Sequence, residues 1–326
     1  MTQYTTKKCV VGVNISLYTT TYAIVDVRGN IIAQEGFPTQ EHPNINEFVA
    51  FLSERLVKLI EANGGYDSIR SVGVGVLSGN FVKGSIQHSP SLPWKGEVPL
   101  ASMLRDQLGM AVTVGNNAHA RALGEHAFGS AHGMRDFIVI TLGPGLGSCF
   151  FSNGRPHMGN DGFAGEVGHV CVKPEGRHCG CGGCGCLETY CAEQGIIRTA
   201  KKLMAESGKA SLMSNCKKLT PKEITACCEQ GDELAIETYC ITGKLLGLGM
   251  ANYASVVNPE AIIFTGGISK AGHWLFDPAR EIFEENVFHN LRGKVKFLSS
   301  TLTDIERSIL GASALAWEVQ EYSLFK

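Results

Sequence analysis

The sequence predicts a two-domain α/β protein, and three observations lead to this fold class. The chain has 326 residues, 44% of them hydrophobic, which is enough for two globular domains with substantial cores. A strand–turn–strand pattern opens the chain near residue 8 and occurs again near residue 137. Strands and amphipathic helices alternate after each opening, as expected for duplicated βββαβα halves. We place the domains at residues 1–128 and 129–303.

The first half is expected to open with a β-meander, followed by a crossover helix. Residues 8–15 form a buried apolar run, and two further strands follow it across short turns. Apolar residues between 48 and 60 recur at the spacing of one helix face. The other elements expected in this half are strands at 20–27, 31–33, 71–77 and 112–114 and a helix at 118–128.

The second half repeats this plan. Strands are expected at 137–142 and 148–151, on either side of a glycine-rich turn. The remaining expected elements are helices near 187–206, 221–229 and 232–256, a strand at 261–265 and a last helix at 304–322. We expect residues 304–326 to pack back on the first domain.

Charge and composition exclude several classes of protein. A net charge of -2 gives no electrostatic reason to expect nucleic-acid binding. No apolar run approaches the roughly 18 residues that a membrane span requires, and no export signal is evident at the start. Most of the twelve cysteines are scattered among apolar neighbours, which is typical of a reducing compartment. We therefore predict a cytoplasmic protein without a membrane partner.

A dense cluster of possible metal ligands lies in the second half. His169 is followed by Cys179, Cys181 and Cys186, which together supply four soft ligands for a structural zinc ion. Intervening glycines let the backbone turn tightly enough for the four to converge. Adjacent C-x-C pairs form strained disulfides, so a metal site is the favoured reading. Cys184 stays an alternative ligand, because it could replace one of its neighbours.

Four motifs together resemble those of the ROK family of sugar kinases, and the similarity is greatest to its glucokinases. They are G-E-V-G-H at 165–169, C-G-C-G-G-C-G-C-L-E at 179–188, N-P-E-A-I-I-F-T-G-G at 258–267 and S-P-S-L-P-W-K-G at 89–96. In the last, Ser91 stands where the family usually has asparagine. The resemblance implies a hexokinase/actin-like (ribonuclease H-like) fold with a zinc-binding loop. It also implies a homodimer that binds a hexose, glucose or a close relative, in the interdomain cleft and ATP on the C-terminal domain.

The resemblance also assigns roles to individual residues. Carboxylates and amides can read the positions of sugar hydroxyls, because a hydroxyl both donates and accepts hydrogen bonds. Two glycine turns correspond to the family's phosphate and adenosine contacts. The implied sugar ligands are Asn116, Glu166, His169 and Glu188, and the implied nucleotide or phosphate contacts are Gly143, Gly145, Gly266 and Gly267.

Three departures from the family's pattern affect phosphate binding and proton transfer. Asn14 replaces the first acid of the Asp-x-Gly-Gly-Thr turn, whose glycines are also missing. Pro144 replaces the threonine of a Gly-Thr-Gly turn, so that position offers neither a hydroxyl nor an amide hydrogen. Asn117 replaces the aspartate that acts as general base, and an amide cannot accept that proton at neutral pH. His119, two residues further on, should point to a different face of the helix.

These observations leave hypotheses of different kinds. The first is an ATP-dependent hexose 6-phosphotransferase in which loss of the base strongly impairs transfer, with ATP and Mg²⁺ binding in doubt. The second is a pseudokinase that binds a hexose and acts as a sugar sensor. A DNA-binding repressor is disfavoured, because the first strand begins by about Lys8, leaving no room for a helix-turn-helix, and the chain is not basic.

Overall fold

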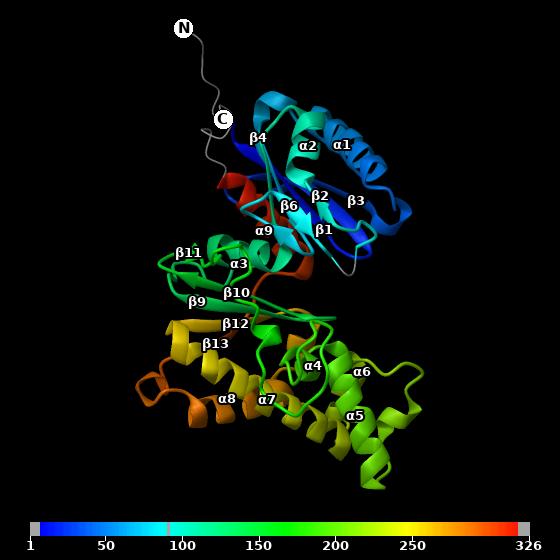
Figure 1. The fold of residues 1–326 in the computed structure, drawn as a ribbon, viewed down its shortest axis with the longest axis vertical. Coiled ribbons are helices and arrows are strands. Elements are labelled where there is room, and N and C mark those ends of the chain that lie inside the picture. The colour runs from blue at the N-terminus through cyan, green and yellow to red at the C-terminus, as the bar shows by residue number, and fades with distance from the viewer. Residues whose placement is uncertain (1–6, 90–91, 319–326) are drawn as a thin grey trace. The chain divides into compact units, whose positions relative to one another are not determined.

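The computed structural model describes residues 7–89 and 92–318, and these fall into two compact units (Figure 1). Unit 1 contains the described residues of 1–133, 158–163 and 301–326. Unit 2 contains Met134–His157 and Ala164–Ser300. The chain therefore leaves unit 1 and returns to it twice, first for the short segment Met158–Phe163 and then with its last helix.

Unit 1 is built on a five-stranded sheet of order β3-β2-β1-β4-β8. The first three strands form an antiparallel meander, whereas β4 and β8 run parallel to β1. The elements are β1 (Cys9–Ile15), β2 (Thr19–Asp26), β3 (Ile31–Pro38), α1 (Ile45–Ala62), β4 (Ile69–Val76), α2 (Leu100–Leu108), β8 (Val112–Asn116), α3 (Asn117–Phe128) and α9 (Asp304–Trp317). A second, three-stranded sheet consists of β5 (Gly79–Asn80), β6 (Ser85–Gln87) and β7 (Glu97–Val98).

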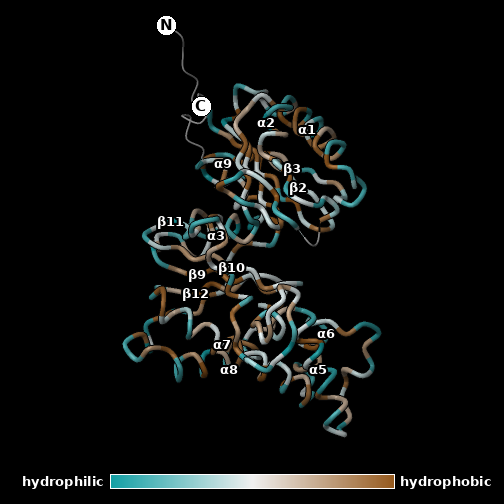
Figure 2. Tube along the Cα trace, viewed as in Figure 1, coloured by the Kyte–Doolittle hydropathy of each residue, from teal (hydrophilic) through white to brown (hydrophobic). Residues whose placement is uncertain are grey.

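Helices cover both faces of the large sheet in unit 1. Alternate residues of β1 point to opposite faces, so Val11 and Val13 share a core with α1 and α2, whereas Val10 packs with α9. Along α1, hydrophobic residues recur every three or four positions between hydrophilic ones, as expected for a helix with one buried face (Figure 2). The helix α9 also lies close against α3, where a Cβ on Gly311 would fall 2.3 Å from the carbonyl oxygen of Ala120.

Unit 2 is built on a sheet of order β11-β10-β9-β12-β13. Its elements are β9 (Phe137–Leu142), β10 (Leu146–Ser152), β11 (Arg155–Pro156), α4 (Glu188–Cys191), α5 (Glu193–Ser207), α6 (Pro221–Glu229), α7 (Glu233–Val257), β12 (Ala261–Thr265), α8 (His273–Asn286) and β13 (Lys296–Ser299). The 3₁₀ helices of the described chain are η1 (Thr39–Glu41), η2 (Tyr66–Ser68), η3 (Val167–His169), η4 (Leu212–Asn215), η5 (Gly267–Ala271) and η6 (His289–Leu291).

One predicted helix differs from the structure in its extent. The helical pattern near 187–206 is divided into α4 and α5, because Ala192 has an extended backbone with φ of -83° and ψ of 169°. Alanine is a strong helix former, so the sequence gives no sign of this break. Residues 319–322, which belong to the predicted last helix, lie outside the described residues.

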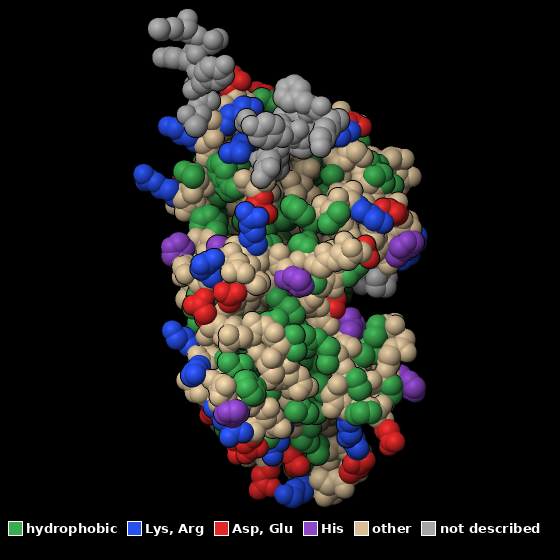
Figure 3. All heavy atoms as spheres, turned by 60° about the vertical axis from the view of Figure 1, so that its left-hand side comes forward, with side chains coloured by type: hydrophobic (Ala, Val, Ile, Leu, Met, Phe, Trp, Pro, Cys, Tyr) green, Lys and Arg blue, Asp and Glu red, His purple; other side chains and the backbone are tan. Residues whose placement is uncertain are grey.

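Basic and acidic side chains are interspersed on the face drawn in Figure 3, in keeping with the net charge of -2. Within residues 7–89 and 92–318, no helix combines the length and the apolar character needed to cross a bilayer.

Candidate functional site

The two predicted acids of unit 2 are both held near the start of β10. The carboxylate of Glu188, at the beginning of α4, accepts a hydrogen bond of 2.8 Å from the amide of Leu146. Gly168 lies so close to the same residue that a Cβ there would be 2.6 Å from the carbonyl oxygen of Leu146. The second glycine of the G-E-V-G-H motif therefore allows the segment that carries Glu166 to lie against β10.

The charges of Glu166, His169 and Glu188 act on one another. Glu166 is open to solvent, but the surrounding protein removes part of its hydration, which raises its pKa above the ordinary value. His169 lowers that pKa, whereas the charge of Glu188 raises it further. Burial, and to a lesser extent the charge of Glu166, raises the pKa of Tyr253 to about 12. The group thus offers carboxylate acceptors beside a phenol that keeps its proton.

Four predicted metal ligands converge in unit 2. One ligand atom from each of His169, Cys179, Cys181 and Cys186 lies within 4.8 Å of the others. The Cys179 Sγ to His169 Nδ1 distance is 3.6 Å, and the Cys181 Sγ to Cys186 Sγ distance is 3.7 Å. Zn–S bonds of about 2.3 Å and Zn–N bonds of about 2.0 Å place tetrahedral ligand atoms about 3.6–3.8 Å apart. The donor set and its spacing therefore fit one tetrahedral zinc ion.

Cys184, the alternative ligand, points elsewhere. Its Sγ donates a hydrogen bond of 3.0 Å to the carbonyl oxygen of Gly176, and it is not part of the converging group. Cys181, by contrast, accepts a hydrogen bond from the amide of Gly183 and contacts Cys179, which lowers the pKa of its thiol. Burial and the neighbouring thiols raise the pKa of Cys186 to about 12, so the four ligands are assigned from their convergence and not from their pKa values.

Arg177 fastens the cysteine-rich loop to the helices that follow it, and sequence reasoning did not identify this residue. Its guanidinium donates to the carbonyl oxygens of Thr189 and Gly195 at 2.7 and 2.8 Å. It also lies over the ring of Tyr190, 4.5 Å from the ring centroid. Since Thr189 directly follows Glu188, this contact fixes the backbone that carries the second acid.

The first candidate phosphate turn has little left to offer an anion. Between β1 and β2, the Ser16 amide donates to the carbonyl oxygen of Thr19 at 3.0 Å. The Thr19 amide donates in return to Ser16 Oγ at 3.1 Å. These are groups that a phosphate-binding turn presents to its ligand, but here they are consumed by the turn itself. Tyr18, 67% exposed, adds bulk at the tip.

The second candidate phosphate turn is similarly depleted. The amide of Gly143 donates to the carbonyl oxygen of Gly145 at 3.0 Å, and that of Leu146 is taken by Glu188. Pro144 has no amide hydrogen. A Cβ on Gly145 would come 2.9 Å from the Glu188 carboxylate, so this glycine is explained by packing beside the acid. The two turns therefore present fewer donors to a triphosphate than the family's pattern supplies.

The predicted adenosine turn gives a mixed result. Gly266 has φ of +91°, and a Cβ there would lie 2.2 Å from the carbonyl oxygen of Leu142. This glycine is therefore required for packing against β9, whatever it binds. Gly267 has no heavy atom within 4 Å of an added Cβ, so the space beside it is open.

Asn116 and Asn117 lie in unit 1, where β8 ends and α3 begins. Asn116 is the N-cap of α3, and its side-chain oxygen accepts a hydrogen bond of 2.8 Å from the amide of Ala118. Its NH₂ group is then the part suited to a ligand. Asn117 is half-buried, whereas His119 is only 4% exposed. Ser91 lies outside the described residues.

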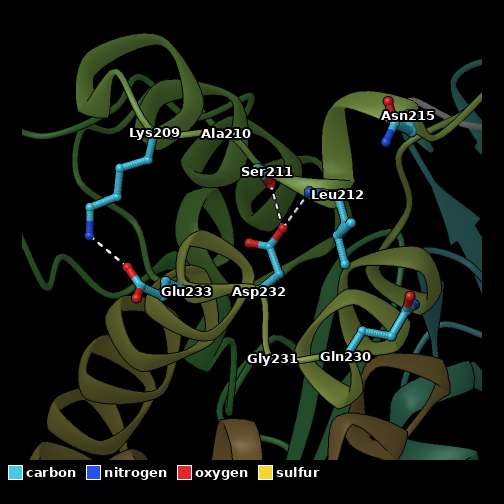
Figure 4. A pocket seen from close by; sticks show the side chains of 9 residues that line it. All are labelled: Lys209, Ala210, Ser211, Leu212, Asn215, Gln230, Gly231, Asp232 and Glu233. Carbon is cyan, nitrogen blue, oxygen red and sulfur yellow. Dashed lines mark hydrogen bonds and ion pairs between the residues drawn. The ribbon is translucent and has the colours of Figure 1, made fainter.

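A surface pocket elsewhere in unit 2 carries no evident chemistry (Figure 4). Asp232 dominates it, but its carboxylate is occupied by Ser211 Oγ at 2.8 Å and by the amides of Leu212 and Ala235. Lys209 and Glu233 form an ion pair at its rim. These contacts explain the residues as a helix cap and a loop anchor.

The sequence is similar to glucokinases and to an N-acetylglucosamine repressor. The profile of the ROK family matches residues 10–319. The glucokinase of Halalkalibacterium halodurans is 31% identical over 325 residues, which cover 97% of each protein. The N-acetylglucosamine repressor of Escherichia coli O6:H1 is 28% identical over 316 residues, which cover 94% of this chain and 74% of the repressor.

Solved structures of the same family have a similar fold. A ROK family glucokinase from Streptomyces griseus, in complex with glucose and AMPPNP, matches with a TM-score of 0.78 at 28% identity, covering 95% of this chain and 100% of that one. A ROK hexokinase from Thermus thermophilus has a TM-score of 0.78 at 23% identity, over 95% and 98% of the two chains. These matches confirm the predicted two-domain hexokinase/actin-like fold class.

Proposed function

The chain belongs to the ROK family and is a glucokinase-like member of it, and on this premise we propose that it binds a hexose but transfers phosphate from ATP poorly. By descent the reaction is ATP-dependent phosphorylation of a hexose at its 6-hydroxyl. The observation that carries the proposal is a contrast between two groups of residues. Glu166, His169 and Glu188 are present and anchored, whereas Asn117 replaces the base.

The sugar-binding part of the proposal is supported by the acids of unit 2. A carboxylate accepts two or more hydrogen bonds in its plane, so Glu166 and Glu188 suit a ligand rich in hydroxyl groups. One oxygen of Glu188 is oriented by the Leu146 amide, which leaves the other to a ligand. The NH₂ group of Asn116, in unit 1, is the group through which we propose that this residue binds a sugar hydroxyl.

Impaired transfer follows from the missing base and the occupied turns. Loss of a general base alone costs about 10²- to 10⁴-fold in rate. The hydrogen bonds within the turns at Ser16 and Gly143 remove donors that would stabilise transferred phosphate. His119 is no substitute, because it is only 4% exposed in unit 1.

We further propose that His169, Cys179, Cys181 and Cys186 hold one structural zinc ion. Four protein ligands leave no open position, so the ion fixes the loop and takes no part in chemistry. Elemental analysis of the purified protein should find one zinc per chain. Absence of zinc from protein expressed with zinc in the medium would refute this assignment.

Calorimetric titration with a panel of hexoses, with and without Mg-ATP, separates the two halves of the proposal. We expect one or more hexoses to bind and Mg-ATP to bind too weakly to give measurable heat. If no hexose binds, the proposed sugar site is wrong. If Mg-ATP binds tightly, the argument from the two turns is wrong.

A coupled assay for ADP release tests the role of Asn117. Wild-type turnover should be far below that of an ordinary kinase, and Asn117→Asp should raise it if nucleotide still reaches the site. Asn44→Asp is the matched control, because it adds the same charge to unit 1 at the N-cap of α1, where aspartate is an equally good cap. Wild-type turnover in the usual range of about 1–100 s⁻¹ would contradict impaired transfer.

The alternative is a hexose-binding pseudokinase that acts as a sugar sensor. The same contrast favours it, because the anchored acids need no phosphate donor to bind a sugar. Hexose binding in the wild type, together with no ADP release in either the wild type or Asn117→Asp, would support the sensor. Slow but measurable wild-type turnover, raised by Asn117→Asp, would support a weak kinase.

A further inference from the structure

We propose that Ser148 is a positioning residue that holds Glu166 in place. The first residues of strand β10 would then align both acids of the sugar site. The proposal rests on the hexose-binding function above. Nothing in the sequence motifs points to Ser148, because it lies in the middle of an apolar strand.

The hydroxyl of Ser148 binds the backbone on both sides of Glu166. It donates a hydrogen bond to the carbonyl oxygen of Gly165 and accepts one of 3.0 Å from the amide of Val167. The carbonyl of Gly165 and the amide of Val167 belong to the two peptide groups that flank Glu166. A change at either bond would therefore redirect the side chain between them.

Water is poorly placed to replace this hydroxyl. Ser148 is 5% exposed and Val167 is fully buried. When a buried hydrogen-bonding partner is removed, the groups left behind lose their partner without gaining water. Gly165 and Val167 would keep only the hydrogen bond of 2.8 Å that joins the Val167 amide to the Gly165 carbonyl oxygen, and this bond does not tie the backbone of Glu166 to β10.

The same strand also fixes the other acid. Leu146, two residues before Ser148, donates its amide to Glu188 and packs against Gly168. Leu146 acts through its backbone amide, which points in the plane of the sheet, and Ser148 acts through its side chain, so the two contacts come from positions two residues apart on one strand. The strand is itself registered by antiparallel pairing with β9, Leu146 opposite Leu142 and Ser148 opposite Ile140. The spacing of the two acids is thus set by a paired strand.

The first test is hexose affinity in Ser148→Ala, which removes the hydroxyl and little volume. We expect the Kd for the hexose to rise about tenfold, with zinc content unchanged. Ser255→Ala is the matched control, because Ser255 also donates to one backbone carbonyl, of Ala251, and accepts from one amide, of Phe288. It should leave the Kd within about twofold of the wild type.

A double-mutant cycle distinguishes positioning from general weakening of the fold. If Ser148 acts through Glu166, then Ser148→Ala should change the Kd by less than about twofold in a Glu166→Gln background. A tenfold change that persists in this background would overturn the proposal. Ser148→Cys, of similar size but with a weak hydrogen-bonding group, provides a second variant if the alanine protein does not fold.

Hydrogen exchange tests the same contacts without any sugar. The Val167 amide should exchange at least tenfold faster in Ser148→Ala, whereas the Leu146 amide, bound to Glu188, should be unchanged. If the wild type binds no hexose, the proposed function fails, and exchange at Val167 still decides whether Ser148 holds the backbone. Unchanged exchange at Val167 would overturn the positioning role whatever the sugar result.

Discussion

Asp232 gives the clearest test at the scale of a single residue (Figure 4). It caps α7 by accepting from the Ala235 amide at 2.9 Å, and it also accepts from Ser211 and Leu212. Burial alone would raise the pKa of this carboxyl, but the hydrogen bonds outweigh burial and lower the pKa below 3.8. We predict that Asp232→Ala lowers the free energy of unfolding by about 1–2 kcal/mol at pH 7.

The pH dependence of that loss has a definite sign. A lowered pKa in the folded state means that the contribution of Asp232 is fully present above the unfolded value, about 3.9. It is lost as the pH falls through the lower folded pKa. Urea unfolding at pH 7 and pH 3 should therefore show a larger difference between wild type and variant at pH 7. An equal difference at both pH values would contradict the ionised cap, and Asp232→Asn, which keeps a capping oxygen, should lose less than alanine.

Candidate site residues could be chosen from the sequence where a motif fixes the chemistry. Glu166, Glu188 and the four metal ligands all belong to short runs of unusual composition, so they could be selected before the fold was known. Ser148 and Arg177 could not, because serine and arginine are common and their partners are backbone groups brought near by folding. Supporting contacts of this kind have no signal in the spacing of residues.

Elements were predictable where their hydrophobic period is long and regular. The meander of unit 1, α1, α6 and α7 follow from such patterns. The small sheet of β5, β6 and β7 does not, since two- and three-residue strands carry no period. The break between α4 and α5 was missed as well, because at Ala192 tertiary packing overrides local preference.

The helix α9 supplies a prediction at the scale of an element. Arg307 of α9, 5% exposed, donates to the fully buried carboxylate of Glu125 in α3 at 3.2 Å. It also binds Asp304 and the carbonyl oxygen of Leu302. Breaking a buried ion pair by removing one partner is strongly destabilising, so Arg307→Met should cost about 3–5 kcal/mol of stability.

An exposed pair of the same unit provides the comparison. Arg55 and Glu35 are 2.7 Å apart, with side chains 38% and 43% exposed. Arg55→Met should therefore cost no more than about 1 kcal/mol. Chemical denaturation of both variants measures the two losses in the free energy of unfolding. Similar losses would contradict the prediction that the buried α3–α9 pair contributes more than the exposed one. The double variant Arg307→Met with Glu125→Leu should recover part of the loss, since the buried carboxylate is removed together with its arginine.

At the scale of the whole molecule, the two units should differ in their need for zinc. Among the residues between 170 and 187, few are buried, so apolar packing contributes little to the loop. The loop has backbone hydrogen bonds of its own, from the Gly185 amide to the Arg177 carbonyl and from the Cys179 amide to the Gly183 carbonyl. They lie in the segment that carries the converging ligands, so we expect the ion to hold them in place. Unit 1 contains none of these ligands and has its own core of sheet and helices.

We predict that a strong chelator speeds amide exchange at Cys179 and Gly185 at least tenfold, because the loop loses the ion that closes it. Amides of β1, in the core of unit 1, should keep their protection. Cys181→Ser should reproduce the effect of chelation without any chelator. Cys184→Ser should retain zinc and normal exchange, because the Cys184 thiol is directed to Gly176. Zinc loss in Cys184→Ser, or unchanged loop exchange after verified removal of zinc, would contradict a structural ion held by His169 and the three other cysteines.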